Sequence, residues 1–366
     1  MWNHQIKIIL VLFMTAFLLE PFSAFSLPKQ NEQLVTMDID VPLPETLVLC
    51  GEPLPLLDSW AWEMLDRELT IAVWDKSQVF LWLKRAGRYF PYFEKKLAQE
   101  KLPDDLKYLA VAESSLLSSI KSKQGAVGPW QFMDGTAEEN GLRTDKSIDE
   151  RRDLEQSTEA ALDHLRRLKE MFGNWTLAMA AYNCGENRIK KEIKDQQEND
   201  FYRLKLPEET ERYIFRIAAV KLIMENPESY GYRVPESKIY KPLKYDTIKV
   251  RIKNKIHITD FAKAIGTTFK MIRYLNPQII NDYLPTGAYN LNTPNGTAEK
   301  VMSALGNLAS GSTPVSEKTS SKFYTVLEGD TLKGISRKSG ISVDRLIKLN
   351  NLNGSTIKAG EVLSLE

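Results

Sequence analysis

Histidine and cysteine are scarce in this chain, which contains three His and two Cys among its 366 residues. These few residues are scattered, so the usual zinc-ligand spacings do not occur and no metal site is predicted. An excess of charge of either sign is also lacking, because 49 Lys and Arg residues stand against 48 Asp and Glu residues. Binding to nucleic acid therefore has no electrostatic basis in the composition.

The apolar run near the N-terminus is too short to cross a bilayer, which takes about 20 residues. It covers only Ile8 to Leu19, after the positive charge of Lys7. Ala24 and Ser26 then supply the small residues of a cleavage site. Residues 1–26 are predicted to be a signal peptide that exports the protein to the periplasm or cell envelope. An uncleaved membrane anchor is the alternative.

Residues 27–75 form a lead-in that is rich in proline and acidic residues over its first half. It contains one of the two cysteines, Cys50. In an oxidising compartment Cys50 could pair with Cys184. Two free, partly buried thiols are the other interpretation, and the sequence leaves the choice open.

In the remaining chain the spacing of apolar residues changes once, from a helical pattern to an alternating one. A hydrophobic content of 43% and a charged content of 27% indicate a globular chain of two or three domains. Apolar residues recur at steps of three and four from residue 76 to 232, which predicts a helical domain. Alternation from Tyr245 to Ile252 then predicts a strand. We therefore expect a mainly α protein with small α+β modules after residue 240.

A helix predicted between residues 102 and 117 carries a carboxylate, Glu113, on its apolar face. The apolar side chains of that face are Leu102, Leu106, Leu109, Leu116 and Leu117. A carboxylate in such surroundings loses hydration, which raises its pKa and keeps it protonated near neutral pH. Glu113 is thus a candidate general acid. A single polar residue tolerated in a helix core is the alternative.

Two nearby segments suit the lining of the same site. Gly125, Gly128 and Pro129 predict a tight loop, and Trp130–Phe132 adds aromatic rings and an amide that suit a sugar ring. Further on, a buried helix of small residues ends in Tyr182-Asn183-Cys184-Gly185. Tyr182 and Asn183 are either a buried hydroxyl and a helix cap or part of a cleft.

Together these motifs resemble the catalytic domain of soluble-type lytic murein transglycosylases, in particular the branch of membrane-bound transglycosylase D. The resemblance covers about residues 76–232. It rests on Glu113-Ser114, Ser122, Gly125-Ala126-x-Gly128-x-Trp130-Gln131-Phe132-Met133, Asp149 to Asp153, Ala181-Tyr182-Asn183-x-Gly185 and Glu209-Thr210-x-x-Tyr213-Ile214. The chain departs from that branch at Ser118–Lys121, where Pro-Ala is usual, and at Pro129, where an apolar residue is common.

The resemblance implies a goose-lysozyme-like fold and a reaction on peptidoglycan glycan strands without a cofactor. Glu113 would protonate the oxygen between N-acetylmuramic acid and N-acetylglucosamine, and then take the proton of the muramyl C6 hydroxyl to form a 1,6-anhydro ring. The resemblance makes Ser122, Gln131, Tyr182, Asn183 and Tyr213 substrate-binding residues. A goose-type muramidase that hydrolyses the same bond and a non-catalytic peptidoglycan-binding scaffold remain alternatives.

A repeat follows the helical domain, since residues 258–276 can be laid over residues 331–350. The second copy, residues 322–366, resembles the peptidoglycan-binding LysM module. The resemblance implies that Asp330, Thr331 and Asn350 contact glycan. The first copy, within residues 240–297, looks like a degenerate module of the same kind. Residues 298–321, rich in Ser, Gly and Thr, are predicted to be a flexible linker.

Overall fold

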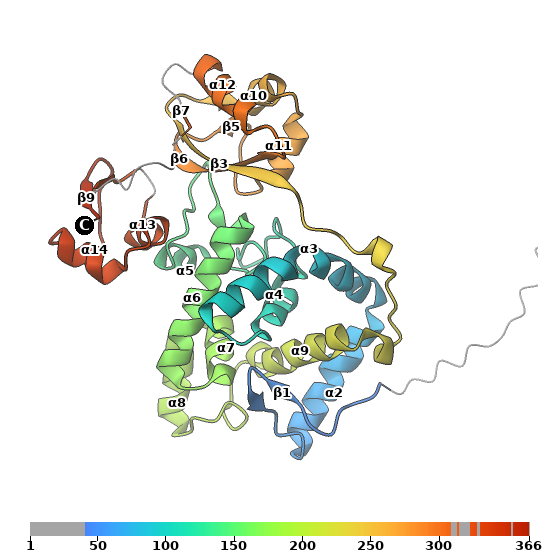
Figure 1. Ribbon diagram of the computed structural model, residues 1–366. Coiled ribbons are helices and arrows are strands. Elements are labelled where there is room, and N and C mark those ends of the chain that lie inside the picture. The colour runs from blue at the N-terminus through green and yellow to red at the C-terminus, as the bar shows by residue number, and fades with distance from the viewer. Residues whose placement is uncertain (1–40, 309–312, 315–322, 328–329, 353, 366) are drawn as a thin grey trace, which may run out of the picture. The chain divides into compact units, whose positions relative to one another are not determined.

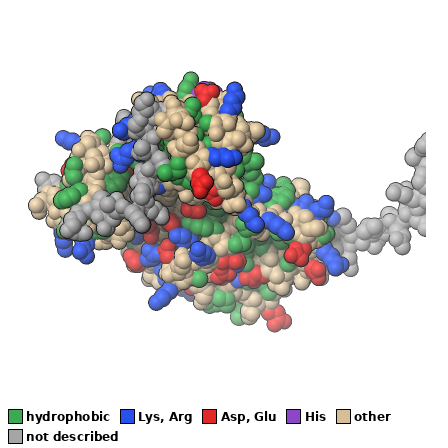
Figure 2. All heavy atoms as spheres, turned by 45° about the horizontal axis from the view of Figure 1, so that its top comes forward, with side chains coloured by type: hydrophobic (Ala, Val, Ile, Leu, Met, Phe, Trp, Pro, Cys, Tyr) green, Lys and Arg blue, Asp and Glu red, His purple; other side chains and the backbone are tan. Residues whose placement is uncertain are grey.

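The computed structural model describes residues 41–308, 313–314, 323–327, 330–352 and 354–365 (Figure 1). The predicted signal peptide, residues 1–26, and the lead-in up to residue 40 lie outside these residues. Across the ranges that are described, no helix combines the length and apolarity needed to span a membrane. Lys and Arg side chains mix with Asp and Glu on the face seen in Figure 2, in keeping with the balanced composition.

The segment between residues 59 and 225 is helical, as the apolar spacing predicted (Figure 1). Its elements are α2 (Ser59–Trp74), α3 (Lys76–Glu100), α4 (Leu106–Ser114), α5 (Asp134–Glu139), η2 (Glu150–Arg152), α6 (Leu154–Phe172), α7 (Trp175–Cys184), α8 (Glu186–Gln196) and α9 (Glu208–Glu225). Two short 3-10 helices follow, η3 (Pro227–Tyr230) and η4 (Glu236–Lys238). The prediction of a mainly α chain is confirmed.

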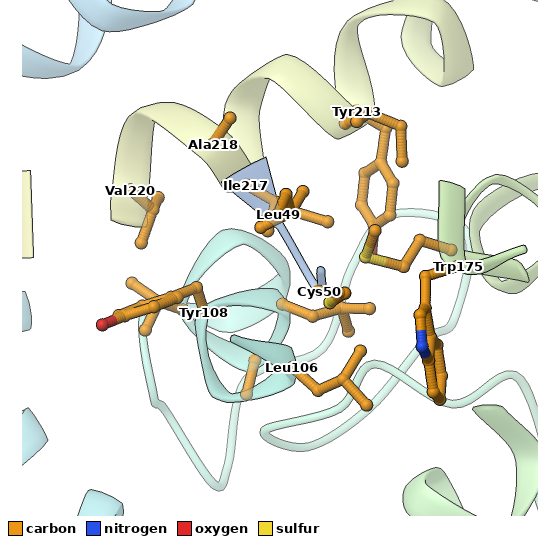
Figure 3. Packing of buried hydrophobic residues seen from close by; sticks show 14 of the residues in the cluster. Leu49, Cys50, Leu106, Tyr108, Trp175, Tyr213, Ile217, Ala218 and Val220 are labelled. Atoms are coloured by element: carbon orange, nitrogen blue, oxygen red, sulfur yellow. The ribbon is translucent and has the colours of Figure 1, made fainter. Parts of the chain in front are cut away.

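Helix α9 is central to the packing of this domain, because it contacts α2, α4 and α7. Ile217 and Ala218 of α9 are fully buried, and Leu106 of α4 is buried in the same core. Figure 3 shows Ile217 beside Leu49 of the first strand, on the side of α9 that faces the helix carrying Leu106. Burying a large aliphatic side chain stabilises the fold by about 1.5–3 kcal/mol. The core therefore holds α4 and α9 in a fixed relation.

A hairpin of β1 (Val48–Leu49) and β2 (Glu52–Pro53) precedes the helices and fastens α7. The Glu52 carboxylate accepts the N–H groups of Trp175 and Thr176, at 2.5 and 2.9 Å, and the Thr176 hydroxyl at 2.7 Å. Burial opposes ionisation of Glu52, but these hydrogen bonds outweigh it and lower its pKa. The first turn of α7, the helix that ends in Tyr182 and Asn183, is thereby anchored.

Both cysteines are free thiols. Cys50 is buried in the turn between β1 and β2, and burial raises the pKa of its thiol well above the usual range. Of the two interpretations, the structure therefore shows the unpaired one.

Helix α4 is shorter than predicted, because it ends at Ser114 and not near Leu117. Ser115 and Leu116 take left-handed φ angles of 54° and 61°, which the helix cannot continue through. The Ser114 hydroxyl lies 3.0 Å from the Ala110 carbonyl and 2.8 Å from the Pro129 carbonyl. The end of α4 is thus tied directly to the glycine-containing loop.

The next module has its own core of buried aliphatic and aromatic side chains. Its elements are β3 (Tyr245–Ile252), β4 (Ile256–His257), α10 (Ile258–Ile265), α11 (Phe269–Leu275), β5 (Tyr283–Leu284), β6 (Gly287–Pro294), α12 (Ala298–Leu308) and β7 (Thr313–Pro314). Strand β3 lies antiparallel between β6 and β7, and β4 pairs with β5.

Helix α12 corrects the predicted linker of residues 298–321. Val301, Ala304 and Leu305 of this helix are buried in the core of the module, so residues 298–308 belong to it. The spacing of these apolar residues puts them on one face of the helix, which packs against the core, whereas a flexible linker has no such face. Residues 309–312 and 315–322 lie outside the described part of the chain.

The C-terminal module repeats the central plan of β4 to β6 with β8 (Phe323–Thr325), α13 (Leu332–Ser339), α14 (Val343–Leu349) and β9 (Val362–Ser364). In both copies an Asn follows the second helix and pins the closing strand. The Asn276 amide bonds the N–H and carbonyl of Asn292, and the Asn350 amide bonds those of Ser364. This shared hydrogen-bond pattern supports the repeat found in the sequence.

Candidate active site

Glu113 lies in the last turn of α4, half-buried, with Tyr213 of α9 against it. The Tyr213 hydroxyl donates a short hydrogen bond to Glu113 Oε1. Burial raises the pKa of Glu113 to about 7, and the Tyr213 hydrogen bond and the charge of Arg216 partly oppose that rise. A carboxylic acid with such a pKa can give up a proton and take one back near neutral pH.

A cavity of about 440 Å³ opens beside Glu113. All five residues that the resemblance named as substrate-binding line it: Ser122, Gln131, Tyr182, Asn183 and Tyr213. They come from the loop after α4, from the end of α7 and from α9. The structure thus brings together residues that are up to 100 positions apart in the chain.

Most of these side chains also hold the walls of the cavity in place. Ser122 Oγ accepts the Ala126 N–H at 3.0 Å, and Gln131 Nε2 donates to the Gly128 carbonyl at 2.8 Å. The Tyr182 hydroxyl donates to the Trp130 carbonyl at 2.7 Å. In addition, Asn183 Oδ1 accepts the hydroxyl of Thr210, a residue of α9, at 2.8 Å.

The loop needs a glycine at position 128. Its φ is +86°, and a Cβ there would stand 1.8 Å from the carbonyl oxygen of Arg151. The guanidinium of Arg151 is itself held by two hydrogen bonds to the buried Asp149 carboxylate, at 2.8 and 3.0 Å. The Asp149–Asp153 stretch therefore packs against the loop at Gly128 and holds it in place.

Several cavity-lining residues were not singled out from the sequence as site residues. They are His164, Arg188, Glu209 and Arg216. Glu209 places a second carboxylate at the cavity, although no second one was predicted beside Glu113. Burial lowers the pKa of His164 to about 4, so its ring is neutral near pH 7. Arg216 could have been found, since it follows Tyr213 by three residues and so shares its helix face.

No three His, Cys, Asp or Glu side chains are grouped as metal ligands within the ranges that the structure describes. Hydrogen-bonding and charged side chains are the chemical groups that the cavity offers.

The three residues expected to bind glycan in the C-terminal module are hydrogen-bonded within that module. Asp330 accepts the Tyr324 hydroxyl at 2.7 Å and the Leu327 N–H at 2.9 Å. Thr331 caps α13 through the Gly334 N–H at 3.0 Å. Asn350 donates to the Leu346 and Ser364 carbonyls, each at 2.9 Å. These contacts give each residue a structural role, and glycan binding by them stays a prediction.

Comparisons with known proteins match two parts of the chain. Residues 90–205 match the family described as Transglycosylase SLT domain, and residues 324–365 match the LysM domain. Membrane-bound lytic murein transglycosylase D of Escherichia coli K12 is 32% identical over 292 residues, covering 77% of this chain and 64% of its own length. The same protein from the O6:H1 strain matches equally. The chain thus spans a little under two thirds of these relatives.

Among solved structures, the 70 kDa soluble lytic transglycosylase of E. coli is 20% identical, covering 46% of this chain and 27% of its own. Its TM-score is 0.30, which is too low to support an argument. The two domain matches, in contrast, contain Glu113 and the C-terminal module, whereas the cavity-lining residues of α9 follow the first match. The chain therefore carries a transglycosylase SLT domain within residues 90–205 and a C-terminal LysM domain within residues 324–365.

Proposed function

We propose that this protein is a peptidoglycan lytic transglycosylase that cleaves the bond between N-acetylmuramic acid and N-acetylglucosamine. The observation that carries the proposal is the protonatable Glu113 at a polar cavity, with Tyr213 hydrogen-bonded to its carboxyl group. The SLT domain match and the similarity to a lytic murein transglycosylase support the same reaction class.

In the proposed reaction Glu113 acts twice. Its carboxylic acid donates a proton to the glycosidic oxygen while the bond from that oxygen to the muramyl C1 breaks. The resulting carboxylate then accepts the proton of the C6 hydroxyl as O6 bonds to C1, which closes the 1,6-anhydro ring. A pKa of about 7 suits both steps, because neither form of Glu113 is strongly favoured near neutral pH.

The remaining lining residues would orient the sugar. Gln131 and Asn183 offer amides, and Ser122 offers a hydroxyl, in the cavity that also contains Glu113. Such groups suit the acetamido and hydroxyl groups of amino sugars. The Tyr213 hydroxyl holds the carboxyl group in place for both proton transfers.

The substrate also fits the two-domain organisation. A LysM domain on the same chain as the catalytic domain would keep the enzyme on insoluble peptidoglycan. Residues 1–26 would direct export to the periplasm or envelope, where this polymer lies. The E. coli relative is named as membrane-bound.

Hydrolysis of the same bond is the second candidate function, and Glu209 is the observation that favours it. This exposed carboxylate lines the cavity that contains Glu113. A hydrolase would use such a group to activate water. The two functions leave different sugar ends, so product analysis separates them.

Replacement of Glu113 by Gln tests the catalytic assignment. The amide keeps the size and hydrogen-bonding capacity of the side chain but has no proton to transfer. We expect turbidity clearing of purified sacculi to fall at least 10²–10⁴-fold, the usual contribution of general acid–base catalysis. Glu208→Gln is the matched control, because that side chain is 80% exposed at the start of α9. Clearing by Glu113→Gln at the control rate would contradict the assignment.

A further inference from the structure

An ion-pair cluster with a buried carboxylate at its centre reaches the cavity through Arg216. Its centre is Glu68 of α2, which is only 4% exposed. Glu68 Oε1 accepts Arg212 Nε at 2.7 Å, and Glu68 Oε2 accepts Arg216 Nε at 3.5 Å. A third guanidinium, that of Arg67, lies 2.6 Å from Oε1. Glu68 thus accepts from both arginines of α9 and holds them against α2.

The two arginines of α9 in this cluster differ in their relation to the cavity. Arg216 lines it together with Glu113, whereas Arg212 does not. Arg216 also follows Tyr213 by three positions, so both side chains project from the same face of α9. One face of α9 therefore presents to Glu113 a hydrogen-bond donor and a positive charge that Glu68 holds in place.

From this geometry we infer that Arg216, fixed by Glu68, is a positioning residue that stabilises the ionised form of Glu113 between its two proton transfers. The inference rests on the proposed function, in which Glu113 must serve first as an acid and then as a base. Burial alone would favour the protonated form and slow the second step. Glu68 and Arg216 both lie outside the segment that matches the SLT domain.

Other groups that bear on the charge of Glu113 are few. Tyr213 of α9 donates to it, and the charge of Glu209, also on α9, raises its pKa. Burial and the nearby Glu113 raise the pKa of Tyr182 on α7, so that hydroxyl stays neutral. The remaining titratable groups of the cavity are His164 on α6, Cys184 on α7 and Arg188 on α8. Arg216 is the cation whose charge lowers the pKa of Glu113.

The test is the pH dependence of cleavage by the full chain on purified sacculi. Arg216→Gln removes the charge but keeps a polar side chain. The pKa of Glu113 then rises, so the alkaline limb of the rate profile should move to higher pH. We expect a shift of about one pH unit, the low end for a neighbouring opposite charge, because Arg216 is 32% exposed. Arg216→Lys keeps the charge and should leave the limb near its original position.

Arg212→Gln is the control for a purely structural role. It removes a charge of the same kind from the same buried Glu68, on the same helix, but outside the cavity. Arg212→Gln should lower the thermal stability as Arg216→Gln does, while the alkaline limb of its rate profile stays at the wild-type pH. If the alkaline limbs of Arg216→Gln and Arg212→Gln lie at the same pH while Glu113→Gln is inactive, the role of Arg216 is refuted and the proposed function is not. Activity retained by Glu113→Gln would instead overturn the proposed function.

Discussion

Glu113→Gln is expected to stabilise the helical domain at alkaline pH while it removes activity. Burial raises the pKa of Glu113 from its ordinary value of 4.5 to about 7 in the folded protein. Between these pH values the folded state holds a proton that the unfolded chain has released. The contribution of protonated Glu113 to the free energy of unfolding is therefore fully present below about pH 4.5 and is lost as the pH rises through 7.

The size of this loss follows from the two pKa values. A difference of one pKa unit is worth about 1.4 kcal/mol, so the change from 4.5 to about 7 corresponds to about 3 kcal/mol. Gln has no ionising group at this position and should not suffer the loss. Its side-chain oxygen can still accept the Tyr213 hydroxyl, so little else at the site should change.

Urea unfolding followed by tryptophan fluorescence measures the effect in the full chain. All Trp residues other than Trp2 lie between Trp60 and Trp175, so the signal reports the helical domain. We expect the variant to gain more over the wild type at pH 8 than at pH 5, approaching about 3 kcal/mol in total. Asp153, whose pKa burial also raises to about 7, titrates in both proteins, so its effect cancels in the comparison. The same advantage at both pH values would refute the desolvation argument.

Two further predictions test the loop and the C-terminal module. Gly128→Ala should reduce cleavage far more than Gly125→Ala in the sacculus assay, because both glycines have positive φ but only Gly128 faces a backbone oxygen at 1.8 Å. Similar losses would mean that φ strain alone explains them. Removing residues 323–366 should lower activity on sacculi but leave cleavage of short soluble glycan fragments nearly unchanged. An equal loss on both substrates would show that the module belongs to the catalytic fold.

The position of the acid could be predicted from the sequence because helix periodicity is local. The spacing of the apolar residues around Glu113 places it on the buried face of its helix, and this inference needs no information about residues far along the chain. The end of its helix could not be predicted in this way. Ser115 and Leu116 have ordinary side chains, and the contact that fixes the turn joins Ser114 to Pro129 fifteen residues later.

Long-range charge pairs could not be predicted from the sequence either, because their partners lie far apart along the chain. Glu68 and Arg216 are separated by 148 positions, and each resembles an ordinary solvated residue of a helix. The sequence around helix α12 favours a linker because Ser, Gly and Thr are frequent there, and the core that buries its three apolar residues forms only in the fold. The sequence also does not show that the Asn350 amide pins the closing strand, because this contact with Ser364 forms only in the fold, and glycan binding by Asn350 stays a prediction.

The most direct test of the proposed reaction is mass spectrometry of the muropeptides released from sacculi by the wild-type protein. Attack by the C6 hydroxyl leaves 1,6-anhydro-muramyl ends, which are lighter than hydrolysed ends by one water. We expect anhydro ends in the wild-type digest and no released products with Glu113→Gln. Reducing muramyl ends in the wild-type digest would contradict the proposed reaction and would assign the protein to the hydrolases.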